Sequence, residues 1–360
     1  MDSFRRALAA AGATGVAALA AASGAQAATV ETVARGLDNP RGVAVGTDGS
    51  VYVANAGRGG SQCQGKGEDR ICLGATGRIV RFANGKASTF AKAFFSGAAP
   101  GGPFALGVHG VSVSPNGKVY GVTTSGPPQM VKSLPAPVRR QTGRLFDVNG
   151  GGFSPVARID RVEWKSNFDK VKGDRNSNPY AVLALADRQI VVDAGANAVF
   201  EVRGSQVKLL AVIPKNGKAQ AVPSSIALGP DGNYYVGELA EGAGKGRARV
   251  WRVPAAGGTP TVYRSGFTAI TGVAFAADGS LFVTEFVRDY RKEDFRGRVV
   301  RVAPDGTRTY LGGKTLLAPT GAAVDSTGAV YVSNFSVLPR KTPKRSEFKG
   351  AGGTLVKITP

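Results

Sequence analysis

The chain has 360 residues, of which 42% are hydrophobic and 51 are glycine, and its 46 Lys and Arg residues outnumber its 25 Asp and Glu residues to give a net charge of +21. This composition is that of a globular protein with many tight turns. After the first 22 residues, no apolar run reaches the length needed to span a bilayer, which excludes a polytopic membrane protein.

The first 27 residues have the pattern of a secretory signal peptide. Arg5 and Arg6 supply a positive start, residues 7–22 are almost wholly Ala, Gly, Val and Leu, and residues 25–27 (Ala-Gln-Ala) offer small residues at the positions that a signal peptidase reads. The apolar run is interrupted by glycines, which favours cleavage over a permanent transmembrane helix. We therefore expect cleavage after Ala27 and a secreted or periplasmic protein.

The strongest signal in the chain is an internal repeat of two short β-rich runs around a tight turn. In most copies the turn is Asp-Gly or Asn-Gly, which is typical of a β-hairpin. The copies begin at Arg41, His109, Tyr180, Ser224, Thr271 and Thr320 and end at Asn55, Thr123, Asp193, Glu238, Glu285 and Asn334. The beginning and the end are 14 residues apart in five copies and 13 in the copy with the shortest turn.

Two further strands follow most copies, as at residues 77–82 and 87–90, so each repeat supplies four strands. Four-stranded repeats of this size are typical of a β-propeller. The last repeat supplies only three strands, and residues 29–34 form a strand without a hairpin partner; pairing the two would close the ring and remove an exposed edge. The sequence therefore predicts an all-β, six-bladed propeller as a single domain of residues 28–360, with a pair of β-sandwiches as the alternative.

The two cysteines, Cys63 and Cys72, enclose a short glycine-rich loop in the first repeat. In an oxidising compartment they are expected to form a local disulfide, with two free thiols as the alternative. Nothing near the pair completes a four-ligand metal set.

The long connections of such a propeller should collect on one face. The tight hairpins join the first strand of each blade to the second, so the connections that follow the second strands and those that link the blades lie at the opposite end. Long segments occur in those places, at residues 56–76, 124–142, 159–178, 239–247, 286–296 and 335–352. Loops on a rigid scaffold commonly carry binding sites. We call this end of the propeller the loop face.

The loop face is rich in Lys and Arg. Its basic residues include Lys132, Arg139, Arg140, Arg144, Arg161, Lys165, Lys170, Lys172, Arg175, Arg288, Arg291, Lys292, Arg296, Arg340, Lys341, Lys344, Arg345 and Lys349. Positive charge of this kind attracts anionic partners. We therefore expect an anionic small molecule, a cell-envelope polymer or a partner protein there rather than nucleic acid, with a solvated, mobile surface as the alternative.

Two sets of residues should meet at the mouth of the central channel on the loop face: the first residues of the inner strands and the last residues of the second strands. The candidate ligand-binding residues among them are Arg41, Asn55, His109, Tyr180, Asp193, Glu238, Glu285 and Asn334. Asp193, Glu238 and Glu285 come from successive blades and offer hard oxygen ligands, so they could hold Ca²⁺ or Mg²⁺. In the alternative, each carboxylate accepts hydrogen bonds from backbone N–H groups at a blade junction.

His109 is the only histidine of the chain and a weak candidate for a catalytic general base. No carboxylate partner is evident from the spacing, and a lone histidine is more often a packed structural residue.

The chain resembles the ScyD/ScyE family of exported propellers over essentially all of residues 28–360. The resemblance rests on residues 36–42, 55–60, 63–72, 177–180 and 193–197. It implies the propeller fold and export, and it leaves the function open.

Two groups of propeller enzymes use comparable positions. Streptogramin lyase resembles this repeat and pairs a histidine at an inner-strand start with a glutamate at a second-strand end, whereas the position paired with His109 holds Thr123. The SMP-30-like lactonases take metal ligands from inner-strand starts, where this chain has no carboxylate. We therefore predict a monomeric binding protein. The alternatives are a metal-assisted hydrolase or lyase using Glu238, Glu285 and His109, and a structural scaffold in an envelope complex.

Overall fold

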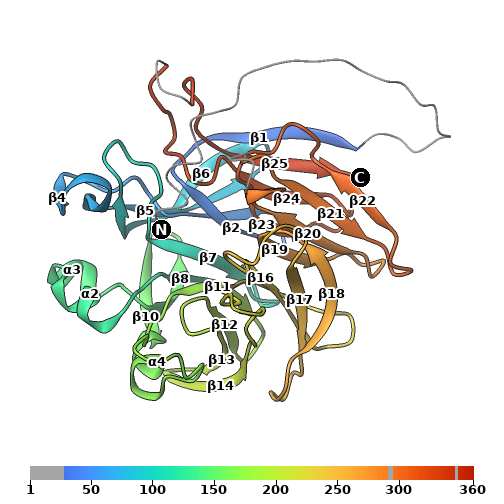
Figure 1. Ribbon diagram of the computed structural model, residues 1–360. Coiled ribbons are helices and arrows are strands. Elements are labelled where there is room, and N and C mark those ends of the chain that lie inside the picture. Colours follow the sequence, from blue (N-terminus) through green and yellow to red (C-terminus); the bar gives the residue numbers. More distant parts are fainter. Residues whose placement is uncertain (1–27, 291–294, 345–347) are drawn as a thin grey trace.

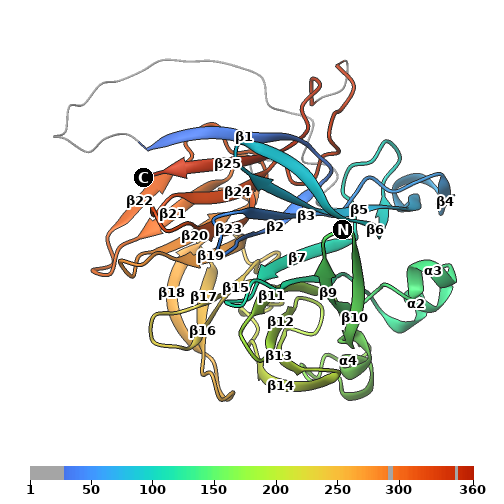
Figure 2. The same ribbon diagram turned by 180° about the vertical axis from the view of Figure 1, so that it is seen from behind.

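The computed structural model describes residues 28–290, 295–344 and 348–360. Within them the strands form six antiparallel sheets, arranged as blades around a central axis (Figure 1, Figure 2). The predicted six-bladed β-propeller is confirmed. The predicted signal peptide, residues 1–27, lies outside the described residues, as do three of the predicted basic residues, Arg291, Lys292 and Arg345.

Each blade takes its strands in chain order from the axis outward, except that β1 completes the last blade. The first blade contains β2 (Pro40–Val45), β3 (Val51–Asn55), β5 (Ile71–Ala83) and β6 (Lys86–Ala98), with β4 (Gln62–Gln64) added beside β5. The second contains β7 (Val108–Val113), β8 (Val119–Thr123), β9 (Arg144–Asn149) and β10 (Gly152–Arg158). The third contains β11 (Pro179–Ala184), β12 (Gln189–Asp193), β13 (Ala198–Arg203) and β14 (Gln206–Val212).

The other three blades follow the same order. The fourth contains β15 (Pro223–Leu228), β16 (Tyr234–Glu238), β17 (Ala248–Val253) and β18 (Thr261–Phe267). The fifth contains β19 (Ile270–Phe275), β20 (Leu281–Glu285), β21 (Arg298–Val302) and β22 (Arg308–Leu311). The sixth contains β23 (Thr320–Val324), β24 (Val330–Asn334), β25 (Gly353–Thr359) and β1 (Thr29–Leu37), which pairs with β25 from Thr29 opposite Thr359 to Leu37 opposite Gly353.

Short helices occur only in connections within the described part of the chain: α2 (Pro128–Ser133), α3 (Ala136–Arg139), α4 (Asp160–Ser166) and the 3-10 turn η2 (Gly67–Asp69). None of the described helices is long and apolar enough to cross a membrane.

The inner strands approach one another closely around the axis. Each contacts the next, from β2 through β7, β11, β15 and β19 to β23, and β23 contacts β2 again. A Cβ placed on Gly272 would lie 2.4 Å from the carbonyl carbon of Gly321, and one on Gly42 would lie 2.8 Å from the carbonyl oxygen of His109. Only glycine allows this approach of two backbones, which explains why glycine recurs just after the inner-strand starts.

The second strand of every blade is buried along its whole length. Such strands lie between neighbouring blades, so their sequences are nearly continuous apolar runs without polar alternation. Each run nevertheless ends on a polar residue at the loop face, such as Asn55 or Glu238, and these residues are also buried. Buried polar groups require hydrogen-bond partners, and the partners determine what each of these residues can do.

Cys63 and Cys72 form the predicted disulfide, with an Sγ–Sγ distance of 2.01 Å. The two residues lie opposite each other on β4 and β5, so the bond joins the exposed strand β4 to the extended end of β5.

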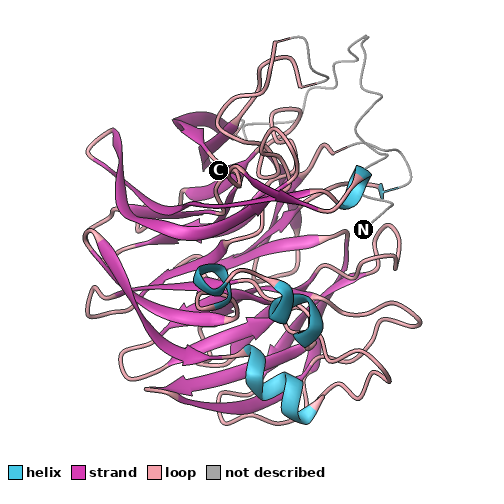
Figure 3. Cartoon of the chain, turned by 90° about the vertical axis from the view of Figure 1, so that its left-hand side faces the viewer, coloured by secondary structure: helices cyan, strands magenta, loops and turns pink. Residues whose placement is uncertain are grey.

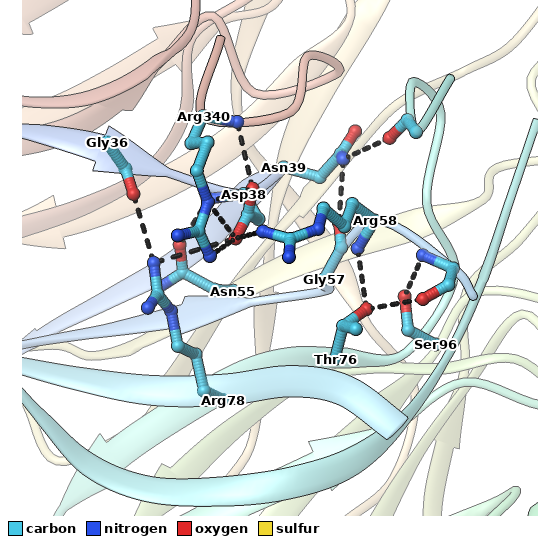
Figure 4. A network of polar contacts seen from close by, with 12 residues as sticks. Gly36, Asp38, Asn39, Asn55, Gly57, Arg58, Thr76, Arg78, Ser96 and Arg340 are labelled. Atoms are coloured by element: carbon cyan, nitrogen blue, oxygen red, sulfur yellow. Dashed lines mark hydrogen bonds and ion pairs between the residues drawn. The ribbon is translucent and has the colours of Figure 1, made fainter. Parts of the chain in front are cut away.

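A buried carboxylate joins the loop that follows β24 to the first blade (Figure 4). The side chain of Asp38 is fully buried, and Arg340 donates to it from its backbone N–H at 2.9 Å and from its guanidinium at 2.5 Å. The guanidinium groups of Arg58 and Arg78 each lie 3.6 Å from the same carboxylate. Burial alone would raise the pKa of Asp38, but the bonds from Arg340 hold that pKa below its ordinary value. Arg340 was predicted to belong to a basic surface, but it forms an ion pair with a buried carboxylate of the protein itself.

Candidate functional site

Five of the six inner-strand starts line the central channel, whereas Arg41 and the ends of the second strands do not. His109, Tyr180, Ser224, Thr271 and Thr320 border a cavity of about 50 Å³. A water molecule occupies roughly 30 Å³ in the liquid, so this space suits a small ion or one or two waters. It is too small for an organic substrate.

The carboxylate of Asp193 accepts hydrogen bonds from residues at its own blade junction. Its Oδ1 accepts hydrogen bonds from the backbone N–H groups of Asn178 at 2.6 Å, Gly195 at 3.0 Å and Ala196 at 3.0 Å. Its Oδ2 accepts from the hydroxyl of Ser177 at 2.6 Å. The carboxylate thus caps backbone N–H groups, which was the alternative to metal binding.

Glu238 accepts hydrogen bonds from three side chains. Arg249 donates through Nε at 2.7 Å, Trp251 donates its indole N–H at 2.9 Å, and Asn216 donates its amide at 2.9 Å. The Glu238 side chain is fully buried, so these contacts neutralise it within the protein.

Glu285 accepts from the backbone N–H of Thr268 at 2.8 Å and from the guanidinium of Arg298. In the described part of the chain, no three His, Cys, Asp or Glu side chains are grouped so as to hold a metal ion. The fold does not bring Asp193, Glu238 and Glu285 together, and the predicted Ca²⁺ or Mg²⁺ site gains no support from their contacts.

The two asparagines of the channel-mouth set serve the same structural purpose as Asp193. The side-chain oxygen of Asn55 accepts from the backbone N–H of Asp38 at 3.0 Å. That of Asn334 accepts from the backbone N–H of Leu317 at 2.7 Å. Each amide therefore ties the end of its second strand to a neighbouring loop.

His109 is buried, with 3% of its surface exposed, and its ring lies edge-on to Tyr180 at a centroid distance of 4.8 Å. Its Nε2 lies 3.4 Å from the carbonyl oxygen of Ala105. Burial, and then the positive charge of Arg41, hold the pKa of His109 well below its ordinary value. The histidine is therefore neutral across the physiological pH range.

A cluster of basic side chains lies on the loop face of the second blade. A pocket of about 480 Å³ opens between the connection that follows β8 and the segment that leaves β10. The helices of these two segments, α2, α3 and α4, lie at the left of Figure 1 and face the viewer in Figure 3. The pocket, called the basic pocket below, is lined by Val131, Lys132, Arg139, Arg140, Arg144, Arg158, Arg161 and Trp164.

Proline determines where the two helices of the first segment begin. Pro128 is in the first turn of α2, and α3 follows Pro135. Proline is well suited to this position because the first turn of a helix needs no N–H donor there. The result is two short helices that carry Lys132 and Arg139 in their last turns.

The basic pocket contains Arg144, the first residue of β9. It is half-buried, and none of its guanidinium nitrogens has a hydrogen-bond partner among the described residues; its Nε is fully enclosed. Burial, and then the neighbouring charges of Arg158 and Arg161, lower the pKa of Arg144. A partly desolvated guanidinium without an acceptor is poised to bind an anion.

The nearest carboxylate does not neutralise the pocket. Asp160 is fully buried and accepts from Arg158 at 2.9 and 2.7 Å and from the hydroxyl of Ser125 at 3.1 Å. Arg158 is therefore paired, whereas Arg144 and the exposed Arg161 have no ion pair in the described structure. The basic pocket keeps a positive field despite this acid.

Trp164 supplies an aromatic surface beside these cations. Its indole N–H donates to the carbonyl of Gly126 at 3.1 Å, and the Arg158 guanidinium lies 5.7 Å from its ring centroid. Sequence analysis singled out the basic loops that form the pocket, but it missed Trp164 and Arg158. Arg158 stands two residues before Asp160 and Trp164 four residues after it, and this spacing is the sequence feature that could have identified both residues.

A buried acid in α4 makes stability depend on pH. Glu163 is fully buried; its Oε2 accepts from the N–H of Phe168 at 3.1 Å, and its Oε1 has no partner among the described residues. Burial, reinforced by Asp169 and Asp193, raises the pKa of Glu163 to about 7.

We expect Glu163→Gln to flatten the pH dependence of unfolding between about pH 5 and pH 8. The pKa is higher in the folded state than the ordinary 4.5, so the stabilising protonated form is fully present below pH 4.5 and is lost as the pH rises through 7. The wild type should lose about 1–3 kcal/mol over this interval. Urea unfolding at a series of pH values measures it, and the exposed Glu68→Gln should leave the slope unchanged.

A family model described as the SMP-30/gluconolactonase/LRE-like region matches residues 147–345. No protein of curated function matches the sequence.

Several solved structures share the fold. The PQQ-bound aldose sugar dehydrogenase from Streptomyces coelicolor superposes with a TM-score of 0.54 at 13% identity, covering 92% of this chain and 98% of that one. A gluconolactonase from Xanthomonas campestris gives 0.53 at 11% identity, covering 92% and 89%. A protein of unknown function from Bacteroides thetaiotaomicron gives 0.57 at 11% identity, covering 92% and 76%. At this identity the likeness shows the fold alone.

Proposed function

This chain belongs to the SMP-30/gluconolactonase/LRE-like family, and within it we propose a binding protein that holds an anionic ligand in the basic pocket. The observation that carries the proposal is Arg144, a half-buried guanidinium without an acceptor among the described residues, in a pocket in which six of the eight lining residues are basic. Arginine guanidinium groups bind carboxylate and phosphate oxygens through charge-assisted hydrogen bonds.

The volume of the basic pocket limits the class of ligand that it can hold. Pockets for small molecules commonly span about 300–1,000 Å³, and the basic pocket has about 480 Å³. A cell-envelope polymer or a partner protein would need a longer positive groove. The ligand that fits is a small molecule with two or more carboxylate or phosphate groups, and an apolar or aromatic part that contacts Trp164.

We further propose that the protein is exported, is a monomeric single domain of residues 28–360, and is of the ScyD/ScyE type. The Cys63–Cys72 disulfide supports export, because disulfides persist in oxidising compartments. Asp38, Arg58 and the disulfide loop fall within the motifs on which the family resemblance rests.

A metal-assisted hydrolase or lyase at the channel mouth draws no support from the contacts found there. Glu238 and Glu285 are engaged by arginines, and His109 has no carboxylate partner in the described structure. A general base must lie within hydrogen-bond reach of the proton that it abstracts from the substrate, and the cavity beside His109 has a volume of about 50 Å³.

Tryptophan fluorescence tests the proposed function directly. The chain has two tryptophans; Trp164 lines the basic pocket, and Trp251 is 4% exposed and bonded to Glu238. Titration with citrate or tripolyphosphate should change the emission of Trp164 saturably, and the affinity should fall as NaCl is raised from 50 to 500 mM, because added salt screens the attraction. Emission that does not saturate, or affinity that is independent of salt, would contradict the proposal.

A further inference from the structure

Several arginines at the loop face have buried acidic partners. Arg340, Arg249 and Arg298 bond to Asp38, Glu238 and Glu285 respectively. Arg41, which begins the inner strand of the first blade, has no ion pair with any described residue, although only 8% of its surface is exposed. A buried charge without a counter-charge is costly, and no residue that the structure describes supplies a counter-charge to Arg41.

The guanidinium of Arg41 is partly satisfied and partly open. Its Nη2 donates to the carbonyl oxygen of Ala105 at 3.0 Å, and its Nε is enclosed without an acceptor among the described residues. Its Nη1 also lacks a hydrogen bond there, but it is not among the enclosed atoms. The open Nη1 is therefore the donor through which Arg41 can reach a ligand.

The surroundings of Arg41 leave its charge unneutralised. His109 lies beside it, with Nε2 directed at the same Ala105 oxygen at 3.4 Å and with Nδ1 buried and unpartnered among the described residues. His109 also lines the central cavity of about 50 Å³. The neighbouring carboxylate, Asp38, is already shared by three other arginines.

We propose that Arg41 binds a small monovalent anion, of the size of chloride or formate, where the central channel reaches the loop face. The anion supplies the missing counter-charge and accepts a hydrogen bond from Nη1. Nη1 is the open donor of this guanidinium, which suits a small ion that accepts one hydrogen bond; Arg41 itself does not line the cavity of about 50 Å³ beside His109. This site is separate from the basic pocket, and the proposal does not rest on the proposed function.

The test compares two sodium salts at constant ionic strength. Replacing sodium gluconate with sodium chloride should raise the Tm of the wild type by about 2–4 °C and saturate, as expected for an ion that binds only the folded state. Arg41→Met should abolish the chloride effect. Arg35→Met, which removes the same charge from an exposed position on β1, is the matched control and should retain it. Equal Tm values in the two salts, or a chloride effect that survives in Arg41→Met, would overturn the proposal.

Bromide locates the ion without any substitution, so the proposal stays testable even if Arg41→Met does not fold. Crystals of the wild type grown or soaked in sodium bromide should show an anomalous peak within hydrogen-bond distance of Arg41 Nη1. Bromide peaks confined to the basic pocket or the outer surface, with none at Arg41, would refute the site. Because the two sites are read out separately, failure of the Arg41 proposal would leave the proposed ligand of Arg144 standing, and the reverse also holds.

Discussion

Arg144→Met is expected to lower the affinity for tripolyphosphate or citrate by about 10- to 100-fold. Hydrogen bonds to charged groups are each worth about 1.5–3 kcal/mol, and about 1.4 kcal/mol corresponds to a tenfold change in Kd. Methionine keeps most of the apolar stem while it removes the charge and the donors. The guanidinium of Arg144 makes no hydrogen bond within the described protein, so its removal should leave the fold intact.

The controls for this prediction separate a specific contact from general electrostatics. Arg35→Met removes the same charge from an exposed position on β1 and should change Kd less than twofold. Arg161→Met, also in the basic pocket, should weaken binding as well. Equal losses in Arg35→Met and Arg144→Met would show that net charge alone attracts the ligand, and the basic pocket would lose its assigned role.

Asp38→Asn is expected to lower the free energy of unfolding by about 3–5 kcal/mol, the usual cost of breaking a buried ion pair from one side. The substitution would leave Arg58, Arg78 and Arg340 close together without the carboxylate that they share (Figure 4). Asp48→Asn is the matched control: Asp48 also pairs with an arginine, Arg81 at 2.7 Å, but half of its side chain is exposed.

The exposed pair should contribute only about 0–1 kcal/mol, so urea unfolding should distinguish Asp38→Asn clearly from Asp48→Asn. The pKa of Asp38 is lowered in the folded state, so its contribution is present above the ordinary value of 3.8 and is lost as the pH falls below it. Similar small losses in the two variants would show that the Asp38 network does not hold the loop after β24 against the first blade.

The basic surface was predicted from the loops, but the prediction did not show which of its residues are neutralised by an acid. Lys132, Arg139, Arg140, Arg144 and Arg161 were all identified as basic loop residues, and they do line one pocket. Arg340 was placed in the same group, yet it is bonded to Asp38. Counting charges along a loop does not show which of them meet a buried acid from another part of the chain.

The channel-mouth carboxylates illustrate the same limit. Their positions at the ends of second strands follow from the repeat, but the arginine partners of Glu238 and Glu285 stand on the third strands. Glu285 lies directly opposite Arg298 in the pairing of β20 with β21, and Arg249 stands on β17, beside the strand that ends at Glu238. A cross-strand search for arginine opposite each acid would have found both ion pairs before any metal was considered.

The fold could be predicted from the sequence because the signals that specify it are local. Each hairpin is encoded by a tight turn between two apolar runs, which is Asp-Gly or Asn-Gly in four copies, and the six copies determine the number of blades. The close approach of the inner strands likewise follows from recurring glycines such as Gly42 and Gly272. The proposed anion sites depend instead on which arginines meet a buried acid. Only the tertiary structure decides that Arg144 and Arg41 are left without acidic partners while neighbouring arginines are paired, because burial and counter-charge come from segments far apart in the chain.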